Sequence, residues 1–162
     1  MFQNNTLDTI NNEIITIIKD FVVSNNILPS IDVGDKVFSS KGLNIAILTR
    51  IANEYDIEDL IEENASKYED GGLGFDNNIL VDNIGMIGIE TIITIDSGNQ
   101  ASSQSALSEN GFCFVELYNY FKTLTLPKEW KLYKLVTENP SFFPFQSSNI
   151  YSLITIRGLY AV

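Results

Sequence analysis

The clearest strand pattern in this chain is Ile84-Gly85-Met86-Ile87-Gly88-Ile89-Glu90-Thr91-Ile92-Ile93-Thr94-Ile95-Asp96. Isoleucines recur at a period of two at positions 87, 89, 93 and 95, whereas Glu90, Thr94 and Asp96 fall on the opposite face. Alternate side chains of a strand point to opposite faces of its sheet. The stretch therefore predicts a strand with one face packed in a core and the other face in water.

Three further stretches predict strands around this one. Residues 43–51 are apolar and β-branched, and part of that strand should be central in a sheet. Residues 132–136 predict a shorter strand, and a last strand is predicted from Ile150 to about Tyr160. The length of this last strand indicates a central place in the sheet or pairing with another chain.

Two amphipathic segments predict helices that cover the sheet. Apolar residues at three-and-four spacing predict a first helix that Thr6 or Asp8 can cap and that ends near Ser24. A second helix is predicted from about Ser103 to Leu124. The expected fold is α+β, with a single twisted, mostly antiparallel sheet of about four to five strands and two main helices packed on it. Residues 1–162 are expected to form a single domain.

The acidic charge of the chain is concentrated in one segment. The formal net charge is −11, and residues 54–96 hold one base, Lys67, against a large excess of acids. These acids are Glu54, Asp56, Glu58, Asp59, Glu62, Glu63, Glu69, Asp70, Asp76, Asp82, Glu90 and Asp96. Acids and bases nearly balance in residues 97–162. We therefore expect an acidic insertion at about 54–83, ahead of a nearly neutral C-terminal part of the chain.

The first part of this segment is the candidate interaction site. Its members are Glu54, Asp56, Glu58, Asp59, Glu62, Glu63, Glu69 and Asp70. Residues 57–63 predict a short amphipathic helix that Asp56 can cap, and residues 69–78 predict an exposed loop. Such acids can bind a basic protein partner, or line a channel and repel DNA that must pass without sticking. A solvated face that keeps the protein soluble is the alternative interpretation.

The residue types leave little room for catalysis. Histidine is absent, which removes Ser-His-Asp and Cys-His catalysis and imidazole metal sites. The glycines at 71–74 lack the lysine of a phosphate-binding loop, and the aspartates at 70, 76 and 82 lack the register of a calcium loop. We expect no catalytic residue, metal or cofactor. A carboxylate pair for glycoside hydrolysis stays open, because its separation depends on the fold.

Other features concern location and partners. Cys113, the single cysteine, lies in an apolar neighbourhood typical of a buried, inert thiol. No apolar run approaches the roughly 20 residues that span a bilayer, and the N-terminus does not have the pattern of a signal peptide. We expect a soluble protein made in the cytoplasm, with protein partners, no membrane and no sequence-specific nucleic-acid binding.

An aromatic stretch near the C-terminus has two interpretations. Phe142, Phe143 and Phe145 lie between Pro140 and a predicted strand, and the stretch is interrupted by Pro144. They predict either an exposed anchor for a partner, since aromatic residues dominate interface hot spots, or core residues that cover one end of the sheet. The pattern alone favours neither.

The expected order is helix, strand, acidic insertion, long strand, helix, strand and a final strand at the C-terminus. This order resembles that of phage tail-terminator and tail-completion (neck) proteins. The resemblance covers most of the chain and lies in element order and size. It implies a viral structural protein, assembled as a hexameric ring that caps the tail tube and joins it to the head in the virion. It also implies that the acidic segment faces the channel. The long acidic insertion departs from the family's pattern.

A second interpretation fits the composition as well. An acidic immunity or inhibitor protein binds and blocks a basic toxin nuclease by presenting carboxylates in place of phosphates. The two interpretations differ in self-assembly, because a ring former needs self-complementary surfaces and an inhibitor is a monomer or dimer.

Overall fold

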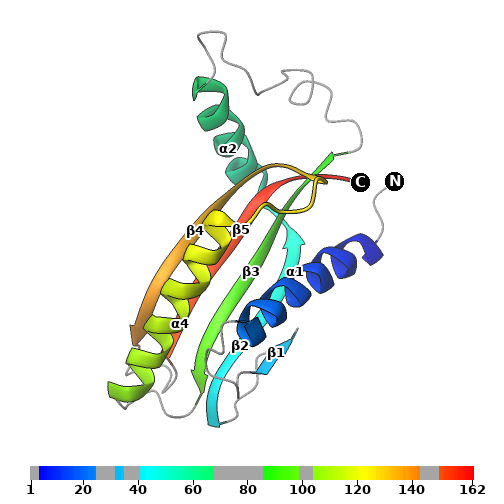
Figure 1. The fold of residues 1–162 in the computed structure, drawn as a ribbon. Coiled ribbons are helices and arrows are strands. Elements are labelled where there is room, and N and C mark those ends of the chain that lie inside the picture. Colours follow the sequence, from blue (N-terminus) through cyan, green and yellow to red (C-terminus); the bar gives the residue numbers. More distant parts are fainter. Residues whose placement is uncertain (1–3, 25–31, 35–40, 68–85, 99–103, 143–149) are drawn as a thin grey trace.

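The computed structural model describes residues 4–24, 32–34, 41–67, 86–98, 104–142 and 150–162 (Figure 1). Its elements follow the expected order. They are α1 (Asn4–Ser24), β1 (Asp32–Gly34), β2 (Lys41–Ile51), α2 (Glu54–Lys67), β3 (Met86–Gly98), α4 (Gln104–Thr123), β4 (Trp130–Phe142) and β5 (Ile150–Ala161). The predicted loop at 69–78 lies outside the described residues.

The strands form one sheet in the order β1-β2-β3-β5-β4. Strands β2, β3, β5 and β4 pair antiparallel, and β1 pairs parallel with β2. The predicted α+β fold with a mostly antiparallel sheet and two main helices packed on it is confirmed. The last strand lies between β3 and β4, as its length indicated. Strand β1 was not predicted, because three residues are too few to show a period of two.

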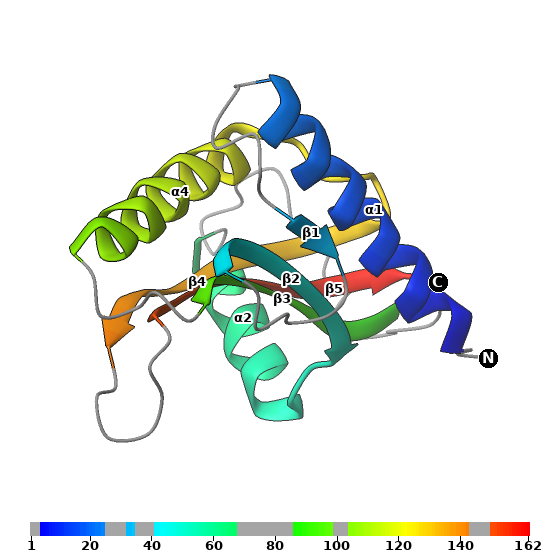
Figure 2. The same cartoon turned by 90° about the horizontal axis from the view of Figure 1, so that it is seen from below.

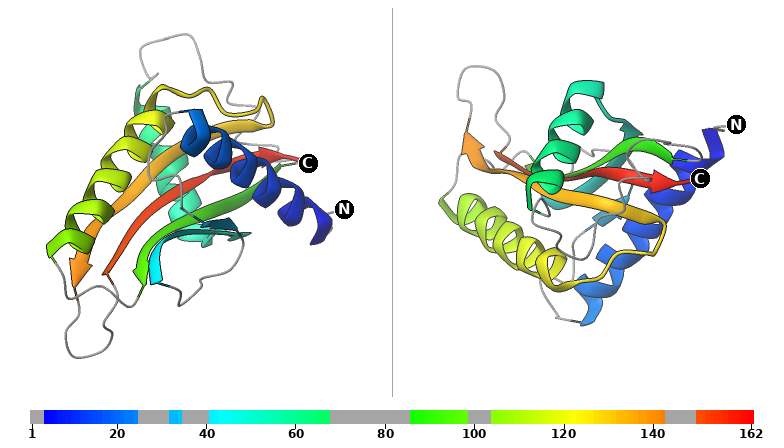
Figure 3. Two further views of the ribbon diagram at one scale, coloured as in Figure 1. Left: turned by 60° about the horizontal axis from the view of Figure 1, so that its bottom comes forward. Right: turned by 90° about the horizontal axis from the view of Figure 1, so that it is seen from above.

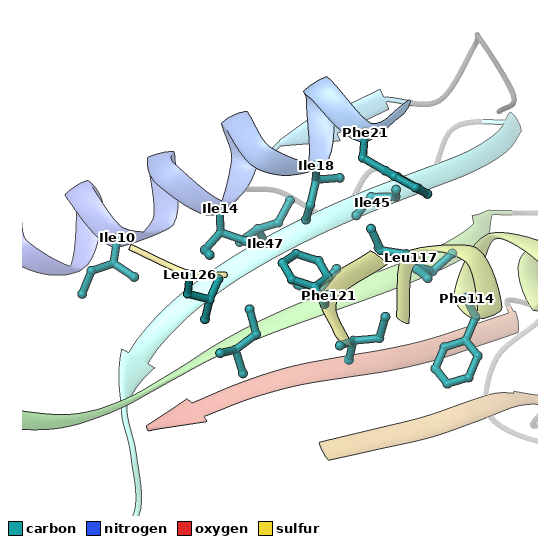
Figure 4. Packing of buried hydrophobic residues seen from close by; sticks show 14 of the residues in the cluster. Ile10, Ile14, Ile18, Phe21, Ile45, Ile47, Phe114, Leu117, Phe121 and Leu126 are labelled. Atoms are coloured by element: carbon teal, nitrogen blue, oxygen red, sulfur yellow. The ribbon is translucent and has the colours of Figure 1, made fainter. Parts of the chain in front are cut away.

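Helices α1 and α4 lie on the same face of the sheet (Figures 1 and 2). The core fills the space between these helices and the strands (Figure 4). Its fully buried members include Ile10, Ile14, Ile18, Ile45, Ile47, Ile89, Ile93, Ile95, Leu117 and Ile154. Burying one such side chain stabilises the fold by about 1.5–3 kcal/mol. The isoleucines of β3 that were predicted to pack are in this core. Cys113 is buried as predicted, and burial raises the pKa of its thiol to about 12.

Two asparagines fasten the helices to the sheet through hydrogen bonds. Asn11 of α1 donates to the main-chain oxygen of Ile47 over 3.2 Å, and its side-chain oxygen accepts from Thr49 over 2.9 Å. Asn110 of α4 donates to a main-chain oxygen of β3, and its side-chain oxygen accepts from Ser152 over 2.6 Å. Hydrogen bonds of this kind, buried at Asn110 and partly buried at Asn11, favour one placement of each helix on the strands.

The opposite face of the sheet is covered in part by α2 (Figure 3). Leu60 of α2 packs there with Leu132 and Leu159 in a second, smaller core. The prediction that this face of β3 is in water is wrong, since Glu90 and Asp96 are both buried. The error arose because period-two alternation shows which residues share a face but not what covers it.

Strand β4 is longer than predicted, and this changes the place of one aromatic residue. Phe142 lies beyond the predicted strand at 132–136, whereas in the structure its backbone pairs with Ile150 at the end of β4. Phe143 and Phe145 lie outside the described residues. Their interpretation as a partner anchor or as core therefore stays a prediction.

Candidate protein-binding face around α2

Helix α2 begins at a side-chain cap. The side-chain oxygen of Asn53 accepts a hydrogen bond from the main-chain N–H of Tyr55 over 2.8 Å, as an N-cap residue does. The prediction that Asp56 caps this helix is wrong by three residues. Glu54 and Asp56 instead lie in the first turn, where their negative charge interacts favourably with the helix dipole.

A glycine lets α2 approach the sheet closely. A Cβ atom on Gly88 would lie 2.6 Å from Cγ1 of Ile57, which is closer than real carbon atoms approach. The apolar side of α2, formed by Ile57, Leu60 and Ile61, packs over this position and its neighbours. The opposite, acidic side of the helix is thereby turned to water, as the pattern predicted.

An ionic cluster under α2 is centred on Glu90. One carboxylate oxygen of Glu90 pairs with Nε of Arg50 over 2.6 Å, and the other pairs with Nε of Arg157 over 3.1 Å. The side chain of Glu90 is only 5% exposed. Arg157 also lies 3.7 Å from the carboxylate of Asp56 on α2. Asp56 therefore takes part in attaching α2 to the sheet, and its side chain is 40% exposed.

A second ion pair joins α2 to the strand at the sheet's edge. Nζ of Lys134 lies 3.1 Å and 3.3 Å from the two carboxylate oxygens of Glu63. Both side chains are in contact with water, so the pair contributes less than about 1 kcal/mol. Glu63 is thus another predicted site acid with an intramolecular role.

Four of the predicted acids remain on the outer side of α2. Glu54, Glu58, Asp59 and Glu62 are exposed. The structure brings them together on one helix, in agreement with the predicted acidic outer side. Glu69 and Asp70, the other two predicted acids, lie outside the described residues.

A cavity of about 280 Å³ lies between α2 and the adjacent strands. Its lining combines apolar groups with two of the exposed acids, namely Ile51, Ala52, Ile57, Ile61 and Gly88 with Glu54 and Glu58. An apolar lining beside carboxylates suits a side chain with an aliphatic stem and a cationic end.

Large apolar side chains are exposed near the end of β2 and at the start of α2, and one of them, Ile51, also lines this cavity. Leu48 is 56%, Ile51 51% and Tyr55 76% exposed. Leu48 and Ile51 lie on β2, and Tyr55 lies in the first turn of α2. We call these three residues the β2 patch. A second pair, Phe112 and Val115 on α4, is half exposed, and we call it the α4 patch. Phe112 and Val115 are not among the residues whose spacing predicted the core face of this helix. Large apolar residues outside that spacing indicate exposed side chains, and this signal is present in the sequence.

Within the described ranges, no group of three or more histidines, cysteines, aspartates or glutamates could hold a metal ion. None of the described helices is both long enough and apolar enough to cross a membrane. Comparison of the chain with protein-family models, with curated proteins and with solved structures gave no match. The function therefore has to be inferred from the residues themselves.

Proposed function

We propose that this chain is a non-enzymatic assembly protein whose subunits pack head to tail in a closed ring. A ring of this kind caps a phage tail tube and joins it to the head, as tail-terminator and neck proteins do. The observation that carries the proposal is the presence of two different exposed apolar patches on one subunit, the β2 patch and the α4 patch.

Ring symmetry explains why two unlike patches matter. A two-fold dimer joins one patch to itself, whereas a head-to-tail ring joins two different surfaces of each subunit. Leu48 and Ile51 of the β2 patch lie on the strand next to the short β1 edge, and Tyr55 lies at the start of α2. Helix α4 packs over β3, β5 and β4 (Figures 1 and 2). Exposed aromatic residues such as Tyr55 and Phe112 are typical centres of protein interfaces.

The acids of α2 have a role in this proposal. Glu58, Asp59 and Glu62 are exposed, and the described part of the chain gives them no ion pair. In a ring, acids that face the channel repel the phosphates of DNA and let it slide. These acids share one face of α2 with Tyr55, at i+3, i+4 and i+7, so they lie at the rim of the β2 patch.

Mixing two assembly-deficient variants tests the head-to-tail arrangement. We expect wild-type protein to form a ring, and Tyr55→Asp and Phe112→Asp each to be monomeric, because each variant has lost one of the two surfaces. An equimolar mixture should form dimers and nothing larger, since each variant keeps the surface that the other needs. Light scattering coupled to size-exclusion chromatography measures the masses.

The control for this experiment is Val23→Asp. Val23 is exposed and belongs to neither patch, so this variant should assemble like the wild type. A wild-type protein that stays monomeric, or a mixture that contains monomers only, would contradict the head-to-tail ring.

The cavity beside α2 favours one other function, that of an acidic inhibitor of a basic toxin nuclease. Its apolar lining with Glu54 and Glu58 suits a lysine or arginine side chain of such a partner. An inhibitor would be a monomer or dimer, so the wild-type mass in the mixing experiment separates the two functions.

A channel role for the outer acids of α2 predicts that their neutralisation leaves the fold and the assembly intact. The triple variant Glu58→Gln, Asp59→Asn, Glu62→Gln should change the free energy of unfolding by less than about 0.5 kcal/mol, because these side chains are exposed. Denaturant unfolding and light scattering measure the two quantities. Loss of the ring in this variant would contradict a channel role for the acids. Loss of salt-dependent binding to a basic nuclease, in a protein that is monomeric, would support the inhibitor.

A further inference from the structure

The face of the sheet opposite the main core is covered only in part. Helix α2 packs across one end of this face and forms the second core there (Figure 3). Because neighbouring strands pair in register, the side chains of this face form rows that cross the sheet. The row that borders α2 is the ionic one, and it consists of Arg50, Glu90, Arg157 and Lys134. The rows beyond it form a separate surface.

The next row along the strands is mainly apolar and belongs to neither core. Leu48 of β2 pairs with Ile92 of β3. Thr155 of β5 pairs with Ile92 on one side and with Val136 of β4 on the other. Leu48 is exposed, the other three are half-buried, and Leu153 in the following row is half-buried as well. Among the described residues, the two cores include none of the four apolar members of this set. We call the five residues the rear patch.

Charges of opposite sign lie at two corners of the rear patch. Arg50 lies two residues from Leu48 on the same face of β2, and its side chain is 60% exposed. In the described ranges its guanidinium forms an ion pair through Nε only, so further N–H donors can bind a second carboxylate. Glu138, which is exposed, pairs with Leu153 at the opposite corner on β4, in the row of Ala46. From the spacing of strands and of residues along a strand, the diagonal between the two corners is about 20 Å.

The outer side of α4 carries the complementary pattern. Phe112 and Val115 lie at its centre, one turn apart and half exposed. Glu109 lies one turn before Phe112, Lys122 lies two turns after Val115, and both charged side chains are exposed. The rise between residues 109 and 122 of a helix is about 20 Å. Two opposite charges therefore flank an apolar pair over the same span as the corners of the rear patch.

We propose that the rear patch is the docking site for helix α4 of a second copy of this chain. The apolar pair of that helix packs on the apolar row. Its Glu109 pairs with Arg50, and its Lys122 pairs with Glu138. The apolar contact supplies most of the affinity, and the two ion pairs fix the orientation of the helix. This inference rests on the proposed head-to-tail ring and states which two surfaces meet in it.

Thiol labelling at position 92 tests whether the rear patch is covered in the assembled protein. Ile92 lies at the centre of the rear patch and belongs to neither the β2 patch nor the α4 patch. The thiol of Ile92→Cys should react with a maleimide at least several-fold more slowly in the ring than in the monomeric variant Ile92→Cys/Phe112→Asp. The native Cys113 does not contribute in the folded protein, because it is buried and burial raises its pKa to about 12.

Val23→Cys is the control, because Val23 is exposed and lies outside the rear patch. Its thiol should react equally fast in the ring and in a Phe112→Asp monomer. Light scattering on the same samples reports whether the ring forms. A ring in which the thiol at position 92 reacts as fast as in the monomer would overturn this docking site and leave the ring standing. A chain that stays monomeric would overturn both proposals.

Exchanging two exposed charges tests the orientation of the docked helix. Lys122→Glu and Glu138→Lys each bring like charges together, so each should raise several-fold the protein concentration at which half of the chains assemble. The double variant Lys122→Glu/Glu138→Lys restores an opposite-charge pair across the contact and should assemble like the wild type. Lys128→Glu changes an exposed lysine outside α4 and outside the rear patch, and it should have no effect. Unchanged assembly in both single variants, or no recovery in the double variant, would contradict this docking of α4.

Discussion

Replacing Glu90 with glutamine is expected to lower the free energy of unfolding by about 3 kcal/mol. Glu90 is almost fully buried, and its two carboxylate oxygens neutralise Arg50 and Arg157. Glutamine keeps the volume and removes only the charge. Arg157, whose side chain is 19% exposed, then faces a neutral amide in a place that water reaches poorly. Urea or guanidinium unfolding followed by circular dichroism measures the loss.

A graded set of variants tests whether the lost charge of Glu90, and not mutation in general, lowers the free energy of unfolding. Arg50→Met should cost less than about 1 kcal/mol, because the Arg50 side chain is 60% exposed and Arg157 still neutralises Glu90. Glu63→Gln, which breaks the exposed pair with Lys134, should also cost less than about 1 kcal/mol. A loss in Glu90→Gln as small as that in Glu63→Gln would show that the buried cluster does not hold α2 on the sheet.

The second large effect is expected at Gly158, where alanine should cost about 3 kcal/mol. A Cβ atom at this position would overlap the main-chain oxygen of Leu132 and lie 2.7 Å from Cβ of Tyr133. The Leu132 oxygen belongs to the main chain of β4, which cannot move aside as the end of a flexible side chain can. The pairing of β4 with β5 shifts register between Trp130 and Leu132, next to this position. Thermal or denaturant unfolding measures the effect.

Two other glycines serve as matched controls. Gly88→Ala meets only the side chain of Ile57, so α2 can shift and the cost should be smaller than at Gly158. Gly34→Ala meets nothing within 4 Å and should change stability by less than about 0.5 kcal/mol. If all three alanine variants lost the same stability, steric exclusion by the main chain of β4 would not be the cause.

The main helices and strands could be predicted from local pattern. The isoleucines of β3 appeared at the correct period, and the helix at 104–123 begins and ends within one residue of the predicted positions. The first helix ends at Ser24 as predicted, but it begins at Asn4, so the prediction that Thr6 or Asp8 caps it is wrong. Local periodicity is a property of neighbouring residues, so it is present before the chain folds. It did not predict β1, and it placed the cap of α2 at Asp56 when Asn53 takes that role.

The candidate site was predicted only in part, and the errors have a common origin. Asp56, Glu63 and Glu90 resemble the other acids of the segment in the sequence. Their partners lie far along the chain, such as Arg157, which is 67 residues from Glu90. Nothing in the sequence shows that these residues meet, because the meeting depends on which strands become neighbours.

Local sequence was sufficient to predict the four long strands, the two long helices and the concentration of acids after residue 54, because hydrophobic period and charge are properties of neighbouring residues. Tertiary structure alone decided which acids pair inside the molecule and which face water. When α2 packs across the second face of the sheet, it excludes water from Glu90 and leaves Glu58, Asp59 and Glu62 exposed. A carboxylate that loses water needs a cation nearby, and only the fold brings one to it.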